Sequence, residues 1–297
     1  MIFLSLLSFA GCEGEWVASD TAKTSCDLSE TPFTSGMALT LSSDGEVLYV
    51  LDRYYDVYRY ARNDARVCAF DLDRTSDLSD AKISVDYAKD IAVAGSFLYY
   101  YDGIGVRRYN DPDWHCDYSM NFMAVTGSYV FGAPSSGINE YKITSSGCSI
   151  ASDASFSAAR VEAIAANSSI VAALETSGAL TDPPERFSVY DKFSGALKVR
   201  SALSSDTSSS LHFCSASRLR LSNSYALLLD AECGYLGVFN YSSGMLEHKL
   251  NLSSIGIRSP VDIATVGDDL YILTGSSVVP LYLVDLASYS WEVDEEN

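Results

Sequence analysis

Acidic side chains recur at matching places beside the short apolar runs of this chain. Asp90, Glu162 and Asp262 stand at the start of runs of small residues, whereas Asp52 and Asp102 end runs of larger ones. Carboxylates that converge on one point attract a hard cation such as Ca²⁺, which takes roughly six to eight oxygen ligands, and two adjacent carboxylates can act as acid and base. The alternative is structural, because an aspartate at a strand end also accepts hydrogen bonds from backbone amides.

Two arginines belong to the same candidate ligand site. Arg218 stands at the start of a run, as Asp90 does, and Arg53 directly follows Asp52. No serine-hydrolase, zinc-protease or nucleotide-binding motif accompanies them. Only three histidines occur, and no cysteine pair has the close spacing of a structural zinc site. We therefore predict no catalytic residue and no cofactor other than Ca²⁺ at the acidic positions, and whether any metal binds stays open.

Residues 52–62, DRYYDVYRYAR, place four tyrosines among aspartate and arginine. Each tyrosine offers a large rigid face and a hydroxyl group, which suits contact with a protein or a sugar. Tyr58 and Tyr60 alternate along a strand and are predicted to point into a core. Tyr54 and Tyr55 lie where that strand should begin, and for them partner binding and a structural role are both open.

The elements that must position these residues repeat along the chain. Similar apolar runs follow one another about 44 residues apart, which is the length of a four-stranded propeller blade. They are VLYVLD (47–52), FLYYYD (97–102), YVFGAP (129–134), IVAALE (170–175), YALLLD (225–230) and LYILTG (270–275).

Runs of small residues precede these strands, as in DIAVAG (90–95) and DIATVG (262–267). Small side chains suit the innermost strand of a propeller, where the blades converge on the axis. We predict an all-β fold, a single six-bladed β-propeller of four-stranded antiparallel blades, favoured over seven blades. Residues 288–293, SYSWEV, are predicted to complete the last blade, so that the ring closes without a strand from the N-terminal segment.

Two stretches carry a family resemblance. KDIAVAGSFLYYYDGIGVRRYNDPD (89–113) resembles the LVIVD-type propeller repeat, and MALTLSSDGEVLYVLDRYYDVYRY (37–60) is similar to the NHL and YVTN style of blade. The resemblance covers about residues 36–293 and implies the propeller fold. It says little about activity, because propellers host many unrelated functions.

The first residues, MIFLSLLSFAGCEGE, resemble the apolar region of a signal peptide that ends in a bacterial lipobox, FAGC (9–12). The resemblance implies cleavage before Cys12, lipidation of its thiol and, from Glu13, an outer-membrane destination. No basic residue precedes the apolar run, which departs from the pattern of signal peptides. The alternative is an apolar N-terminus with a chance cysteine.

On this basis we expect a lipoprotein signal peptide over residues 1–11, a linker over 12–35 and the propeller domain over 36–297. The expected location is the bacterial cell envelope, as an outer-membrane lipoprotein that faces the periplasm or the surface.

The remaining cysteines are even in number, which indicates disulfides in an exported chain. They are Cys26, Cys68, Cys116, Cys148, Cys214 and Cys233. Sequence alone does not decide their pairing, but Cys214 and Cys233 fall within one blade and are the first predicted pair. Cys26 is predicted to tether the N-terminal segment.

The chain is strongly acidic, with 20 Lys and Arg against 39 Asp and Glu and a formal net charge of −19. This charge argues against nucleic acid or an anionic membrane as a partner, because both are polyanions. The leading functional prediction is a lipid-anchored extracytoplasmic module that binds or scaffolds a protein or carbohydrate partner. The alternative is a metal-dependent propeller enzyme of the lactonase or lyase kind that uses the acidic positions.

Overall fold

The structure is a computed structural model of the chain. It describes residues 16–18, 23–33, 35–73, 82–134, 136–151, 156–177, 183–204, 207, 209–215, 218–276, 280–286 and 291–293. The ordered elements of these residues are β-strands. Within the same ranges, no helix has the length and apolar character needed to cross a membrane.

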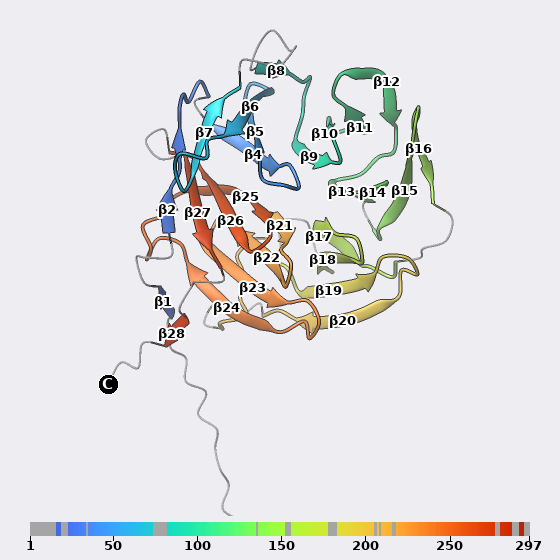
Figure 1. Ribbon diagram of the computed structural model, residues 1–297. Helices are drawn as coiled ribbons and strands as arrows, with labels where there is room; N and C mark the ends of the chain where they lie inside the picture. The colour runs from blue at the N-terminus through green and yellow to red at the C-terminus, as the bar shows by residue number, and fades with distance from the viewer. Residues whose placement is uncertain are drawn as a thin grey trace, which may run out of the picture.

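The strands form sheets, antiparallel within each blade, that are arranged around a common axis (Figure 1). We number the blades by chain order, from the strand pairing of the described residues. The first contains β4 (Gly36–Leu41), β5 (Val47–Asp52), β6 (Asp56–Arg62), β7 (Ala69–Leu72) and β8 (Lys82–Ser84). The second contains β9 (Asp90–Ala94), β10 (Phe97–Tyr101), β11 (Val106–Arg108) and β12 (Asp111–Cys116), and the third β13 (Phe122–Thr126), β14 (Tyr129–Ala133), β15 (Asn139–Thr144) and β16 (Gly147–Ile150).

The fourth blade contains β17 (Arg160–Ala166), β18 (Ile170–Thr176), β19 (Arg186–Asp191) and β20 (Leu197–Ala202). The fifth contains β21 (Arg218–Leu221), β22 (Tyr225–Asp230), β23 (Tyr235–Asn240) and β24 (Leu246–Asn251). The sixth contains β25 (Pro260–Val266), β26 (Asp269–Thr274), β27 (Leu281–Asp285) and β2 (Lys23–Ser25). The innermost strand of each blade contacts that of the next, and β25 contacts β4, which confirms the predicted all-β propeller class.

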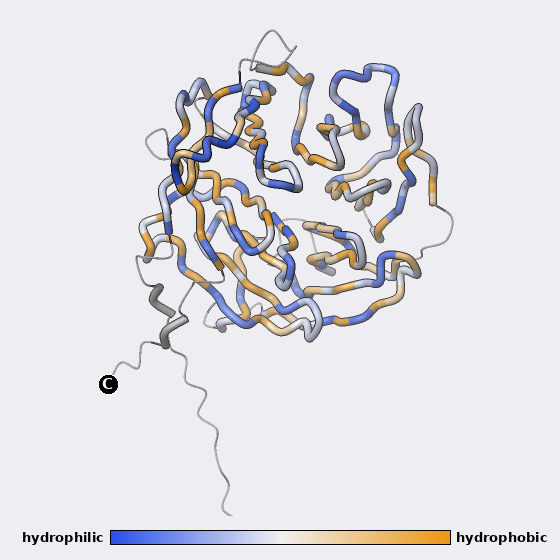
Figure 2. The backbone as a smooth tube through the Cα atoms, viewed as in Figure 1, coloured by the Kyte–Doolittle hydropathy of each residue, from blue (hydrophilic) through white to orange (hydrophobic). Residues whose placement is uncertain are grey.

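The core lies between neighbouring blades, because side chains alternate across each strand. In β22, Leu227 and Leu229 join the cluster shared with the sixth blade, whereas Ala226 and Leu228 join the cluster shared with the fourth. This period of two is the geometry of a strand with both faces buried. Figure 2 shows hydrophobic residues along the strands and hydrophilic ones in many of the connecting turns.

The predicted closure of the ring is wrong. The outer strand of the sixth blade is β2, which pairs antiparallel with β27 through Lys23 and Val284. β28 (Trp291–Val293) pairs instead with β1 (Trp16–Ala18). The physical reason is that the Cys26 amide donates to the Leu281 carbonyl, so the residues just before it lie along the exposed edge of β27.

Disulfides join Cys26 to Cys68, Cys116 to Cys148, and Cys214 to Cys233. The first links the closing strand to the first blade, where β3 (Asp27–Leu28) runs parallel to β7. The second links the outer strands of the second and third blades, which pair at His115 and Gly147. The third ties the connection between the fourth and fifth blades to a loop of the fifth. Disulfides therefore stand at alternate blade junctions, and the predicted Cys214–Cys233 pair and Cys26 tether are confirmed.

Candidate functional site

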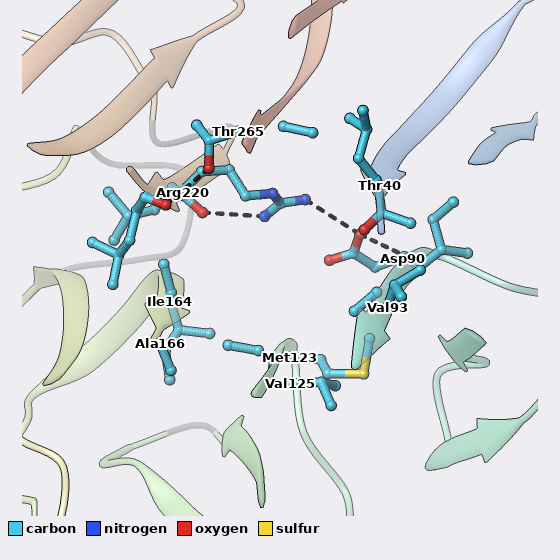
Figure 3. A pocket seen from close by; sticks show the side chains of 17 residues that line it. Thr40, Asp90, Val93, Met123, Val125, Ile164, Ala166, Arg220 and Thr265 are labelled. Atoms are coloured by element: carbon cyan, nitrogen blue, oxygen red, sulfur yellow. Dashed lines mark hydrogen bonds and ion pairs between the residues drawn. The ribbon is translucent and has the colours of Figure 1, made fainter. Parts of the chain in front are cut away.

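The innermost strands enclose a cavity of about 180 Å³ along the axis. Its walls are mainly small or aliphatic side chains, as the sequence pattern of these strands predicts. Figure 3 shows Arg220 reaching from β21 across this channel toward Asp90, which opens β9. The Arg220 Nη2 atom lies 3.8 Å from the Asp90 Oδ1 atom, so a charge pair crosses the axis between the fifth and second blades.

Asp262 of β25 lies beside this charge pair and is fully buried. Its oxygens accept hydrogen bonds from the backbone amides of Leu39 and Ile263, each at 2.8 Å. The same group pairs with Arg218 Nε at 3.2 Å and with Arg220 Nη2 at 3.4 Å. One side chain of the sixth blade therefore contacts the first and fifth blades at the ring's centre.

Burial raises the pKa of Asp90 despite the opposing effects of Arg218 and Arg220, and the nearby Asp262 carboxylate adds to the rise. The pKa of Arg218 is also raised: burial works against the charged guanidinium, but the attraction of Asp262 and Asp90 outweighs it. The cluster thus holds two carboxyl groups against two guanidinium groups. This balance removes the excess negative charge that a Ca²⁺ site requires, so the geometry does not favour cation chemistry here.

The structure brings together Asp90, Arg218 and Asp262 from the predicted set. Sequence reasoning missed Arg220, a long cation that interrupts the small residues typical of the innermost strands. That interruption was the available signal, because a long cation in an innermost strand must extend into the channel.

Two other predicted carboxylates, those of Asp52 and Asp102, accept hydrogen bonds within turns. Asp52 is buried and accepts hydrogen bonds from the Tyr54 amide at 2.8 Å and the Asp56 amide at 3.1 Å. Asp102 accepts from the amides of Ile104 and Gly105, both at 2.8 Å. These are the local side-chain-to-backbone bonds that aspartate makes in tight turns.

Glu162 is buried within β17. Glu175 at the end of β18 is also buried, and it accepts from the Ala159 amide at 2.9 Å and the Tyr190 hydroxyl at 2.7 Å. Burial alone would raise the pKa of Glu175, but hydrogen bonds led by Ser188, with the Arg200 charge, lower it overall. Burial raises the pKa of Tyr190 to about 12, and the hydrogen bond to the Glu175 carboxylate adds to the rise, whereas Arg200 opposes it.

Exposed tyrosines gather on the face where the innermost strands begin, over the first two blades. Tyr54 is 59% exposed, Tyr87 is 70% exposed, and the Tyr55 and Tyr87 rings lie 5.7 Å apart. The guanidinium of Arg53 lies 4.9 Å from the centre of the Tyr54 ring and donates to its hydroxyl at 2.7 Å. We call Arg53, Tyr54, Tyr55 and Tyr87 the tyrosine patch. Tyr58 and Tyr60 are buried, which confirms their prediction as core.

Two neighbours extend this surface toward the second blade. Lys89 is exposed, and its side chain lies over Gly103 in the turn before β11. Ile104, in the same turn, is 70% exposed. Together with Lys89 and Ile104, the tyrosine patch therefore forms a surface of aromatic, aliphatic and cationic groups on a protein whose net charge is negative.

A second hollow of about 370 Å³ lies at the opposite face and shares Leu221 and Thr265 with the channel cavity. Serine and asparagine dominate its lining, but side-chain oxygens of Asn167 and Ser222 accept hydrogen bonds from backbone amides within turns. Asn167 accepts from the Ser169 and Ile170 amides at 2.8 and 3.0 Å. Cys12 lies outside the described residues, so its predicted lipidation stays a prediction.

No family model and no curated protein matches this chain. Among solved structures, U3-55K is 12% identical with a TM-score of 0.52, over 84% of this chain and 80% of that one. Kluyvelomyces marxianus Hsv2 is 9% identical with a TM-score of 0.50, over 80% and 73%. BamB from Moraxella catarrhalis is 11% identical with a TM-score of 0.47, over 96% and 94%. The first two similarities support the β-propeller fold and nothing finer.

Proposed function

We propose that this chain is an exported β-propeller that binds a protein partner through the tyrosine patch and has no chemistry of its own. The observation that carries the proposal is the pair of exposed rings of Tyr55 and Tyr87. Both residues have positive backbone φ angles, 64° and 57°. Left-handed backbone is uncommon for bulky residues and costs free energy, and such strain clusters at binding sites.

The composition of the surface favours a protein over a carbohydrate. Tyrosine and arginine are the residue types that dominate the binding energy of protein interfaces, and Tyr54 and Arg53 already hold each other in place. Ile104 adds exposed aliphatic area beside them. The Tyr55 and Tyr87 rings are tilted by 51°, so they do not form the flat platform on which a sugar ring stacks.

Site-specific crosslinking tests this proposal in the cells that make the protein. A photoreactive amino acid is placed at Tyr87 and, as the matched control, at Phe193, which is 65% exposed in a turn of the fourth blade, on the opposite face. We expect a discrete protein adduct from position 87 alone, and its loss when Tyr54→Ala and Tyr55→Ala are added. Equal adducts from both positions would contradict the proposal.

Carbohydrate binding is the other outcome to measure. Purified protein is titrated with soluble hexasaccharides of glucose and of N-acetylglucosamine while tyrosine fluorescence is followed. Saturable binding that Tyr54→Ala abolishes, together with no protein adduct, would overturn a protein partner in favour of a sugar.

The envelope location rests on separate support. Three disulfides in the described residues are compatible with an extracytoplasmic location, where they form and persist. The lipobox-like FAGC (9–12) supports an anchor at Cys12. The intact mass of detergent-extracted protein should show acyl chains on wild type and none on Cys12→Ala, and an unmodified wild-type mass would refute the anchor.

A further inference from the structure

The third disulfide stands in surroundings unlike those of a purely structural crosslink. Asp230, at the end of β22, is fully buried, and its carboxylate accepts from the Cys214 amide at 2.6 Å and the Cys233 amide at 3.1 Å. One carboxylate thus holds the backbones of both cysteines, whose Cα atoms are 5.9 Å apart. Because these bonds involve the backbone and not the sulfurs, they persist when the disulfide opens.

A histidine is aimed at the sulfur atom of Cys214. The His212 Nε2 atom lies 3.9 Å from the Cys214 Sγ atom. Its other ring nitrogen, Nδ1, lies 3.1 Å from the Ser204 carbonyl oxygen. A carbonyl can only accept, so Nδ1 carries the proton and the Nε2 lone pair faces the sulfur. Histidines that bind metals are held in this way, with the second ring nitrogen donating to a backbone carbonyl.

The backbone around His212 is held as well. The Lys249 ammonium donates to the His212 carbonyl, and the His212 amide donates to the Ser209 carbonyl at 3.0 Å. The Lys249 charge lies 4.7 Å from the centre of the Phe213 ring. The imidazole is therefore positioned independently of the disulfide.

We infer that reduction of the Cys214–Cys233 disulfide unmasks a Zn²⁺ site formed by Cys214, Cys233 and His212, with a carboxylate oxygen of Asp230 also within 4.8 Å of both sulfurs. In a tetrahedral zinc site with bonds of about 2.3 Å to sulfur and 2.0 Å to nitrogen, neighbouring ligand atoms lie about 3.5 Å apart. The observed separation of His212 Nε2 from Cys214 Sγ is close to this value.

The chemistry has two steps. A dithiol reductant gives two electrons and two protons to the disulfide, which becomes two thiols while the reductant becomes a disulfide. Zn²⁺ then binds both sulfurs as thiolates and releases the two protons to solvent. Cys233 is exposed, whereas Cys26, Cys68 and Cys116 are buried, so this disulfide is the one that an external reductant reaches first.

Cobalt substitution in the full chain tests the site. The protein is treated anaerobically with limiting dithiothreitol until two thiols are free, their positions are read by alkylation and peptide mass, and Co²⁺ is titrated. We expect thiols at Cys214 and Cys233, the visible absorption of tetrahedral Co²⁺, a thiolate charge-transfer band, and displacement of the cobalt by one equivalent of Zn²⁺.

Substitutions distinguish a histidine that binds the metal from one that only lies near a disulfide. His212→Gln keeps a donor for Ser204 but removes the imidazole, and should weaken Co²⁺ binding by at least about tenfold. His115→Ala is the matched control, because His115 also adjoins a disulfide cysteine but points to the Asp113 carbonyl at 3.0 Å. It should bind Co²⁺ as wild type does. No tetrahedral spectrum from the reduced protein, an unchanged spectrum in His212→Gln, or thiols that form only as the β-sheet circular dichroism is lost would each overturn the inference.

Discussion

Removal of the Asp262 carboxylate should lower the free energy of unfolding more than removal of any exposed carboxylate does. Asp262→Ala leaves Arg218 and Arg220 without their main counter-charge and leaves the Leu39 and Ile263 amides without an acceptor. Breaking a buried charge pair by removing one partner costs about 3–5 kcal/mol, and each buried amide left unsatisfied adds about 1–3 kcal/mol. These terms overlap, and Asp90 keeps part of the arginine charge balanced, so we expect a net loss of about 4 kcal/mol.

The assay is equilibrium unfolding in urea, followed by far-ultraviolet circular dichroism with all disulfides oxidised. Asp71→Ala is the matched control, because Asp71 is an exposed strand aspartate of the first blade that accepts from Asn63 at 2.8 Å. It should change the free energy of unfolding by no more than about 0.5 kcal/mol. Asp262→Asn keeps an acceptor for one amide but loses the charge. Its loss in the free energy of unfolding should lie between those of Asp262→Ala and Asp71→Ala.

A double-mutant cycle then isolates the charge contribution. Arg220→Ala should cost less in the Asp262→Ala background than in wild type, because the partner is already gone. A loss below about 1 kcal/mol for Asp262→Ala, or additive effects of the two substitutions, would refute the role assigned to this cluster.

Three other substitutions test other contacts in the structure. Tyr190→Phe should make stability fall less steeply between about pH 10 and pH 12. The raised pKa of Tyr190 beside Glu175 makes the folded state keep a proton there that the unfolded chain loses. An equally steep fall in the free energy of unfolding in urea would contradict this. Asp90→Asn should gain stability relative to wild type as the pH rises above about 4, because the raised pKa of Asp90 makes the folded state keep a proton that the unfolded chain loses. A deficit that grows with pH in the same measurement would count against it. Gly237→Ala should cost about 1–3 kcal/mol, because a Cβ there would lie 2.7 Å from the Phe213 ring; an unchanged melting temperature would show that the ring moves freely.

Much of the fold could be predicted because its signals are local. The alternation of Ala226, Leu227, Leu228 and Leu229 requires a strand buried on both faces, and small innermost residues require a crowded axis. The buried role of Tyr58 and Tyr60 follows from the same period. Asp52 and Asp102 could be placed at turns, since an aspartate at a strand end binds amides within its own loop.

The sequence by itself therefore determined the propeller class and the alternation of its cores, which depend on short-range patterns, and it placed Cys214 and Cys233 in the same blade. Only the tertiary structure decided which segment closes the ring, since the edge of β27 can accept either chain end and β2 occupies it. It also decided that Arg220 crosses the channel to Asp90 and that Tyr87 meets Tyr55. These contacts join residues far apart in the chain, and their partners are chosen by how the blades are arranged around the axis, which no local pattern encodes.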